Sequence, residues 1–119
     1  MWNTPSEDRL SKIPKLYETE HIHLQDKLIY LHFFIGGCDW YVAEFDGEDT
    51  FFGFVCLNGW QDCAEWGYIS FNELKQLKVD APVSINGQKA LIPLEVDRDL
   101  NWISRKAFNV SLIRECQCW

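Results

Sequence analysis

The stretch Trp40–Phe54, WYVAEFDGEDTFFGF, places a turn sequence between two aromatic runs. The turn, Asp46-Gly47-Glu48-Asp49, contains acidic residues that tolerate turn geometry and a glycine that readily supplies a positive φ. A connection this short joins antiparallel strands, because parallel strands need a crossover of a dozen or more residues. The stretch therefore predicts a β-hairpin made of residues 40–45 and 51–57.

The segments on either side of this hairpin extend it into a sheet. Residues 28–35 are apolar at every position except His32 and end at Gly36-Gly37, which indicates a buried central strand. Residues 63–69 follow the turn pair Asn58-Gly59 and indicate a further strand. Short turns between successive strands predict an antiparallel meander.

Two capping boxes predict helices before and after the meander. In Thr4-Pro5-Ser6-Glu7 the cap is Thr4 and the proline takes the first helical position, so a short helix is expected to run to about Lys12. Ser70-Phe71-Asn72-Glu73 opens a second helix, which is expected to end near Lys78. Its apolar residues recur at helical spacing and should pack on the sheet.

The last third of the chain predicts a second hairpin and a terminal helix. Residues 83–92 surround Asn86-Gly87, while Pro82 and Pro93 confine the hairpin to an edge or to short strands. After Trp102, apolar residues at spacings of three and four are consistent with a helix covering the sheet. These residues are Ile103, Ala107, Val110 and Ile113.

The 119 residues fit one domain, so we expect a single α+β domain over residues 1–119, with an antiparallel meander of four to five strands and two or three short helices. The N-terminal sequence MWNTPSEDRL is polar and acidic, unlike a signal peptide. The longest apolar run has about half of the roughly 20 residues that span a bilayer. We therefore expect a cytoplasmic protein without a membrane segment.

The chain contains an odd number of cysteines, and without an export signal they are expected to stay reduced. They are Cys38, Cys56, Cys63, Cys116 and Cys118. Cys116-Gln117-Cys118 is too closely spaced for the usual Cys-x-x-Cys metal knuckle. No phosphate loop and no Gly-x-Ser-x-Gly motif occurs, so neither a cofactor nor a nucleophilic mechanism is indicated.

The net charge of −7 arises in the middle of the chain. No Lys or Arg occurs between Lys27 and Lys75, whereas residues 28–74 carry eight acids. Such a negative field repels phosphate backbones, so direct binding of DNA or RNA is not expected. It would attract a basic protein surface. Solubility of an aromatic-rich sheet would explain the same charge.

Several segments resemble a family known as domain of unknown function 2958. The resemblance covers about Ile13 to Leu77 and rests on KIPKLYETE, LHFFIGGCDWYVAEFDGED, FFGFV and EWGYISFNELKQL; PLEVDRDLNW matches more weakly. The family is carried on conjugative plasmids, integrated elements and phages. Its context implies an accessory protein of a mobile genetic element, where small acidic proteins often counter host defence.

These observations lead to a first hypothesis, a non-catalytic protein-binding module. Exposed Trp and Tyr residues rimmed by acids would suit a basic surface of a host or element-encoded protein. Imitation of DNA charge would need a row of carboxylates or an oligomer. The aromatic residues could instead fill the core. The residues expected to bind the partner are Asp39, Trp40, Asp46, Glu48, Asp49, Trp60 and Asp62.

The alternative hypothesis is a small hydrolase or metal-assisted enzyme that uses Glu and His side chains. Glu44 lies in an apolar strand with the parity of Trp40 and Val42, and is either solvent-facing or buried with a raised pKa. Glu65 is the natural second carboxylate, although a register slip of one residue would move it to the other face.

Three histidines complete this alternative. His21 and His23 alternate near Glu18 and Glu20, either as a metal or proton-transfer cluster or as a solvated strand edge. His32 is expected to be a core histidine that donates to a backbone carbonyl. No set of three ligands with clear spacing is present, so no metal site is predicted.

Overall fold

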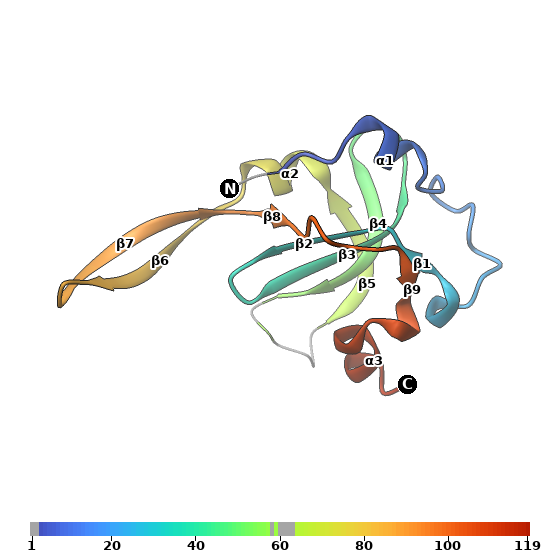
Figure 1. The fold of residues 1–119 in the computed structure, drawn as a ribbon. Helices are drawn as coiled ribbons and strands as arrows, with labels where there is room; N and C mark the ends of the chain where they lie inside the picture. The colour runs from blue at the N-terminus through green and yellow to red at the C-terminus, as the bar shows by residue number, and fades with distance from the viewer. Residues whose placement is uncertain (1–2, 58, 60–63) are drawn as a thin grey trace.

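The computed structural model describes residues 3–57, 59 and 64–119. A five-stranded antiparallel sheet with the order β5-β4-β3-β2-β8 forms its centre, and Figure 1 shows a long hairpin projecting from it. The four consecutive strands pair with their neighbours, which confirms the predicted meander and the α+β class. The strands are β2 (Leu31–Ile35), β3 (Cys38–Phe45), β4 (Thr50–Cys56), β5 (Glu65–Ser70) and β8 (Asp97–Arg98).

The turn between β3 and β4 is held by Asp46. Its Oδ1 accepts hydrogen bonds from the backbone N–H groups of Glu48, Asp49 and Thr50 at 2.8 to 3.0 Å. Gly47 has a φ of +92°, a backbone conformation that residues other than glycine rarely adopt. The turn thus uses the residue types from which the sequence predicted it.

A β-bulge at Ala43 changes which face Glu44 occupies. The register shifts between Val42, which opposes Gly53, and Glu44, which opposes Phe52. The extra residue turns Glu44 to the face opposite Trp40 and Val42, so the parity read from the sequence is wrong at this position.

Both faces of the sheet are buried, which explains why its strands are apolar at both parities. One face packs against α1 (Glu7–Ser11) and α2 (Phe71–Gln76), and its cluster includes Phe33 and Phe51. The other face packs against the C-terminal segment and α3 (Ser111–Gln117), and its cluster includes Phe54 and Trp102. Burial of each such phenylalanine contributes about 2 kcal/mol.

The helix caps agree with the sequence at one helix and differ at the other. Ser70 Oγ accepts from the N–H of Glu73 and caps α2, as predicted. The cap of α1 is Ser6, which accepts from the N–H of Arg9, rather than Thr4. The helix ends at Ser11 with Lys12 as its C-cap, close to the predicted end.

The strand expected over residues 28–35 is interrupted at Tyr30. Ile29 packs on the C-terminal side of the sheet and Leu31 on the side of the two short helices, although the two residues share a parity. The chain must therefore break its alternation between them. Leu28–Ile29 forms β1, which pairs with β9 (Arg105–Lys106), and β2 lies next to the short edge strand β8 rather than at the centre.

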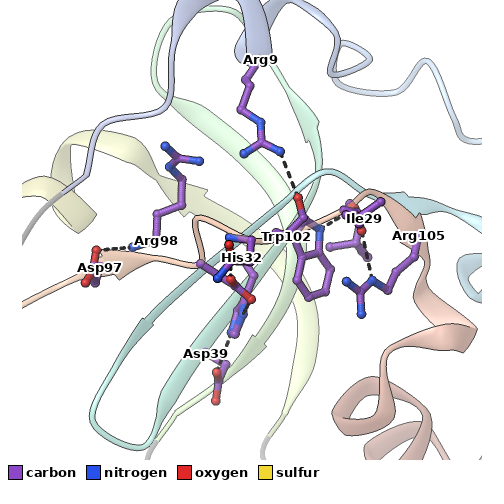
Figure 2. Close-up of polar contacts among 11 residues, drawn as sticks. Arg9, Ile29, His32, Asp39, Asp97, Arg98, Trp102 and Arg105 are labelled. Carbon is purple, nitrogen blue, oxygen red and sulfur yellow. Dashed lines mark hydrogen bonds and ion pairs between the residues drawn. The ribbon is translucent and has the colours of Figure 1, made fainter.

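The terminal helix is shorter than its apolar spacing suggested. Residues 105–106 belong to β9, a 3₁₀ helix covers Ala107–Asn109, and α3 begins only at Ser111. Ile103 is 74% exposed. Trp102 anchors this segment instead, since its Nε1 donates to the carbonyl oxygen of Ile29 at 2.9 Å and its own carbonyl accepts from Arg9 (Figure 2).

The second hairpin, here called the arm, comprises β6 (Lys78–Ile85) and β7 (Gln88–Glu95). Asn86 and Gly87 both have positive φ, which identifies the type I′ turn expected from Asn-Gly. The arm is longer than predicted. In the part of the chain that the structure describes, β6 and β7 pair only with each other, and Figure 1 shows them leaving the rest of the protein, here called the body.

None of the helices in the described ranges is long and apolar enough to cross a membrane.

Candidate functional site

Glu44 and Lys27 form a buried ion pair below the loop that precedes β1. Their side chains are 5% and 6% exposed, and Glu44 Oε2 lies 3.7 Å from Lys27 Nζ. Glu44 also accepts hydrogen bonds from the N–H groups of Tyr17 and Thr19 at 3.0 and 3.2 Å and from the Thr19 hydroxyl. The carboxylate thereby fastens this loop to β3, and the bulge at Ala43 is what aims it there.

An open pocket of about 410 Å³ lies against this ion pair and is here called the tyrosine pocket. Its lining residues are Tyr17, Glu20, Ile22, Leu24, Lys27, Glu44, Phe52 and Tyr68. The two tyrosines are 60% and 59% exposed, and the Tyr68 hydroxyl donates to that of Tyr17 at 3.3 Å. This hydrogen bond raises the pKa of Tyr68, so the Tyr68 hydroxyl stays neutral at physiological pH.

Aromatic rings continue from the tyrosine pocket along β4 and β5. Phe52 lies 5.5 Å from Tyr68 and stacks on Trp66 at 5.9 Å between ring centroids. Trp66 in turn donates from its indole N–H to Gln117 of α3. The row of aromatic rings that begins at the pocket therefore ends in a hydrogen bond to the terminal helix.

The charges of the pocket leave one carboxylate available at its surface. Lys27 offsets the charge of Glu44, whereas Glu20 is exposed at the rim. Aromatic faces attract cations, and a nearby carboxylate strengthens that preference. The arrangement is chemically suited to a basic side chain, such as an Arg or Lys of a partner protein.

The acidic residues expected to bind a partner are mostly engaged within the protein. Asp46 holds its turn, and these backbone hydrogen bonds, that from Glu48 first, lower the pKa of its carboxyl group. Asp49 accepts from the Ser70 hydroxyl and from the N–H of Asn72 at 2.7 and 2.6 Å, which ties it to the start of α2. Of these turn acids, Glu48 is the exposed one.

The other expected partner-binding residues do not form one surface: one lies in the core, one pairs with His32, and two are outside the described residues. Trp40 is 6% exposed and packs in the core, where it presents almost no surface to a partner. Asp39 lies 2.7 Å from Nε2 of His32. Trp60 and Asp62 lie outside the described residues.

His32 lies between two carboxylates rather than beside a backbone acceptor, and Figure 2 shows one of them, Asp39, beside the imidazole. Its Nδ1 is 3.8 Å from Oδ2 of Asp99, beyond hydrogen-bond distance. Its ring stacks on Tyr41, with 4.4 Å between centroids. Burial, with a contribution from Asp39, raises the pKa of the Tyr41 hydroxyl. The expectation of a carbonyl partner for His32 is therefore wrong, because β3 places Asp39 directly beside the imidazole.

The residues of the enzymatic alternative do not converge on one site. Glu65 is exposed and opposes Val55, on the face of β4 away from Phe52, so it does not share a face with Glu44. His21 and His23 are exposed in the loop before β1. Within residues 3–57, 59 and 64–119, no group of three or more His, Cys, Asp or Glu side chains could hold a metal ion.

Two thiols from distant parts of the chain meet between β4 and α3. Cys56 and Cys116 interact through a side-chain hydrogen bond, and burial raises the pKa of both thiols. Cys56, Cys116 and Cys118 form no disulfide bond with one another. Cys63 lies outside the described residues.

Sequence reasoning missed three residues that contact Glu44 in the buried ion pair or its hydrogen bonds. Tyr17 and Thr19 fall in a segment without clear periodicity, and Lys27 had no visible partner. The ion pair joins positions 17 residues apart, so only the folded register could reveal it. The one usable signal was Glu44 itself, a carboxylate in an otherwise apolar strand.

Comparisons of the chain with protein families, with curated proteins and with solved structures find no match in any of the three. The tyrosine pocket is the place where a buried ion pair, exposed aromatic rings and a surface carboxylate coincide.

Proposed function

We propose that this protein is a non-catalytic binding module whose tyrosine pocket receives a basic side chain from a partner protein. The observation that carries the proposal is the combination of Tyr17, Phe52 and Tyr68 with Glu20 around one open pocket. Arg and Lys bind aromatic faces through cation–π contacts of about 0.5 to 2 kcal/mol, depending on desolvation. A mobile-element context, with a host or element-encoded partner, is the setting that the family resemblance implies.

The charge distribution supports the same class of partner. Residues 28–74 contain eight acids and no Lys or Arg, so the long-range field around the sheet is negative. Such a field speeds the encounter with a basic surface and does so less at high salt. The tyrosine pocket would then supply the short-range specificity that a diffuse field lacks.

This proposal places the partner at the tyrosine pocket and not at the turn acids Asp46, Glu48 and Asp49, where the sequence predicted it. Asp46 and Asp49 hold the β3–β4 turn and the start of α2, so reversing their charge would damage the fold as well as any interface. The exposed side chain of Glu48 has no such structural role, so its substitution can test whether the partner binds at the β3–β4 turn. Glu20 is likewise exposed, so its substitution can test binding at the tyrosine pocket.

The experiment captures partners from host lysate on the immobilised protein at low and at high salt. We expect a stoichiometric basic partner that is lost as salt rises. Glu20→Lys and Tyr68→Ala should each weaken its capture at least about tenfold, since they remove an attractive charge and an aromatic wall. Glu48→Lys should weaken it far less.

The control is Asp80→Lys, which makes the same charge change on the arm. Equal loss with Glu20→Lys and Asp80→Lys would mean that net charge alone governs binding and would refute a specific pocket. If Glu48→Lys reduced capture of the partner as much as Glu20→Lys, the partner would bind at the β3–β4 turn and not at the tyrosine pocket.

A further inference from the structure

The arm has one apolar face that, apart from Leu94 at its base, nothing in the described part of the chain covers. Paired residues of an antiparallel hairpin point to the same side, and the pairs alternate between sides. Val79 opposes Leu94, and Ala81 opposes Ile92. Ile85 is 52% exposed and Ile92 is 40% exposed. The face comprises Val79, Ala81, Val83, Ile85, Ala90, Ile92 and Leu94, with the polar Gln88 beside Ile85 at the tip.

Both edges of the arm are closed to another strand by proline. A two-residue type I′ turn closes on a hydrogen-bonded pair, here Ile85 and Gln88, and the two kinds of pair then alternate along the arm. Pro82 and Pro93 therefore fall in pairs whose backbone nitrogens face outward. Since proline has no N–H, neither edge can accept a full strand, and the face is the surface left for docking.

The apolar face runs into a groove on the body. Val79, the first apolar residue of the arm, lines this groove together with Leu77. The groove measures about 430 Å³, and Leu57 at its margin is 48% exposed. Its remaining lining residues are Ile35, Cys38, Trp40, Val55, Tyr68, Ile69, Ser70, Glu73 and Leu74. Arm and groove form one continuous apolar surface.

We propose that this surface is occupied by a second copy of the chain, with the two arms packed face to face and antiparallel. The arm alone measures about 26 Å by 10 Å, or roughly 260 Å² in projection, against about 800 Å² per partner in a standard interface. In the antiparallel arrangement the tip of each arm also reaches the groove at the base of the other. The two-fold symmetry therefore uses the arm and the groove of both copies.

The charges of the arm favour a second copy as the occupant. The arm carries two lysines and two acids, so it is neutral in a chain of net charge −7 and adds no repulsion where two copies meet. The pairing places all four charged residues on the opposite face of the arm, so packing the apolar faces of two copies together buries no charge.

Sedimentation equilibrium tests the proposal on the full chain, at loading concentrations from about 1 µM to about 1 mM, which bracket the affinity of a small interface. The mass should rise from the 14.0 kDa of one chain toward twice that value. Ile92→Glu, on the apolar face, should weaken association at least about tenfold. Leu91→Glu, on the opposite face and 67% exposed, is the matched control and should change it less than about threefold.

A single-chain mass at every concentration would overturn the proposal, as would a dimer that tolerates Ile92→Glu as well as Leu91→Glu. Orientation is read from contacts between labelled and unlabelled copies by isotope-filtered NMR. Ile85 of one copy should contact Val79 of the other. Contacts between the two copies of Ile85 would instead mean parallel arms and would overturn the antiparallel arrangement.

Discussion

Glu44 and Lys27 show how a single residue can be essential to one loop. The pair is buried, and the Glu44 carboxylate also accepts hydrogen bonds from Tyr17 and Thr19. A buried ion pair gains little over apolar residues of similar size, but loss of one partner leaves an uncompensated charge. The pair therefore matters chiefly because it fixes where the loop lies, and with it one wall of the tyrosine pocket.

Glu44→Gln is expected to lower the free energy of unfolding by about 3 kcal/mol, because Lys27 remains charged and buried without its partner. The double variant Lys27→Met, Glu44→Gln should lose less than the sum of the two single variants. Urea unfolding measures all four proteins. Glu20→Gln, at the exposed rim, is the control and should change stability by less than about 0.5 kcal/mol; strict additivity would contradict the coupling.

Asp46 gives the stability of the protein a pH dependence. Its pKa is lower in the folded state than its unfolded value of about 3.9, so its contribution is fully present above that value. The contribution is lost as the pH falls through the folded pKa, because both states then bind the proton.

Wild type should be more stable than Asp46→Asn at pH 7, and the difference should shrink as the pH falls below about 4. Urea unfolding at a series of pH values measures it. A difference that stays constant down to pH 2 would mean that the charge of the Asp46 carboxylate has no part in stabilising the turn.

At the scale of elements, the bulge in β3 determines the tyrosine pocket. It turns Glu44 toward Phe52 and away from the face of Trp40. The opposing strand meets it with Gly53, where a Cβ would lie 1.9 Å from the carbonyl oxygen of Tyr41. Gly53 is therefore required by close backbone approach, not by a positive φ.

Gly53→Ala should destabilise the protein by about 3 kcal/mol or more, because the backbone of β3 has to move. Gly67, on the neighbouring strand β5, has no atom within 4 Å of its ideal Cβ position and provides the matched control. Gly67→Ala should change stability by less than about 1 kcal/mol. Thermal unfolding of both variants checks the contrast, and similar midpoints would contradict it.

At the scale of the whole molecule, the arm and the body are separate structural units. The molecule extends 54 Å along its longest axis and 22 Å along its shortest, with the arm responsible for the elongated outline in Figure 1. Neither core cluster contains a buried residue of the arm, and only Leu94 packs against one of them. The arm is thus free to serve an interaction without supporting the fold.

Replacing Asp80–Pro93 by Asn-Gly should leave a folded body. The new turn would close on Val79 and Leu94, a pair of the same hydrogen-bonded kind as Ile85 and Gln88. The free energy of unfolding should change by less than about 1 kcal/mol, because no buried residue is removed. Urea unfolding at low protein concentration measures it; a collapse of stability would show that the arm supports the body.

The local chemistry of the sequence determined the elements whose signals lie within a few residues. The Asp46–Asp49 turn, the Ser70 cap and the Asn86-Gly87 turn each satisfy their own backbone groups, so they could be predicted without knowing the rest of the fold. Together with short connections, they were sufficient to predict the antiparallel meander. The broad negative charge of residues 28–74 was equally visible in the sequence.

Only the tertiary structure decided the bulge at Ala43, the break at Tyr30, the irregular path after Trp102 and the burial of Glu44 against Lys27. Each depends on a partner far away in the chain, and pairing with that partner overrides the local pattern. A strand changes face when its register shifts by one residue, and nothing in the periodicity of one strand records where its neighbour will sit. The meander followed from local turns, whereas the tyrosine pocket exists because distant strands and loops were brought into one register.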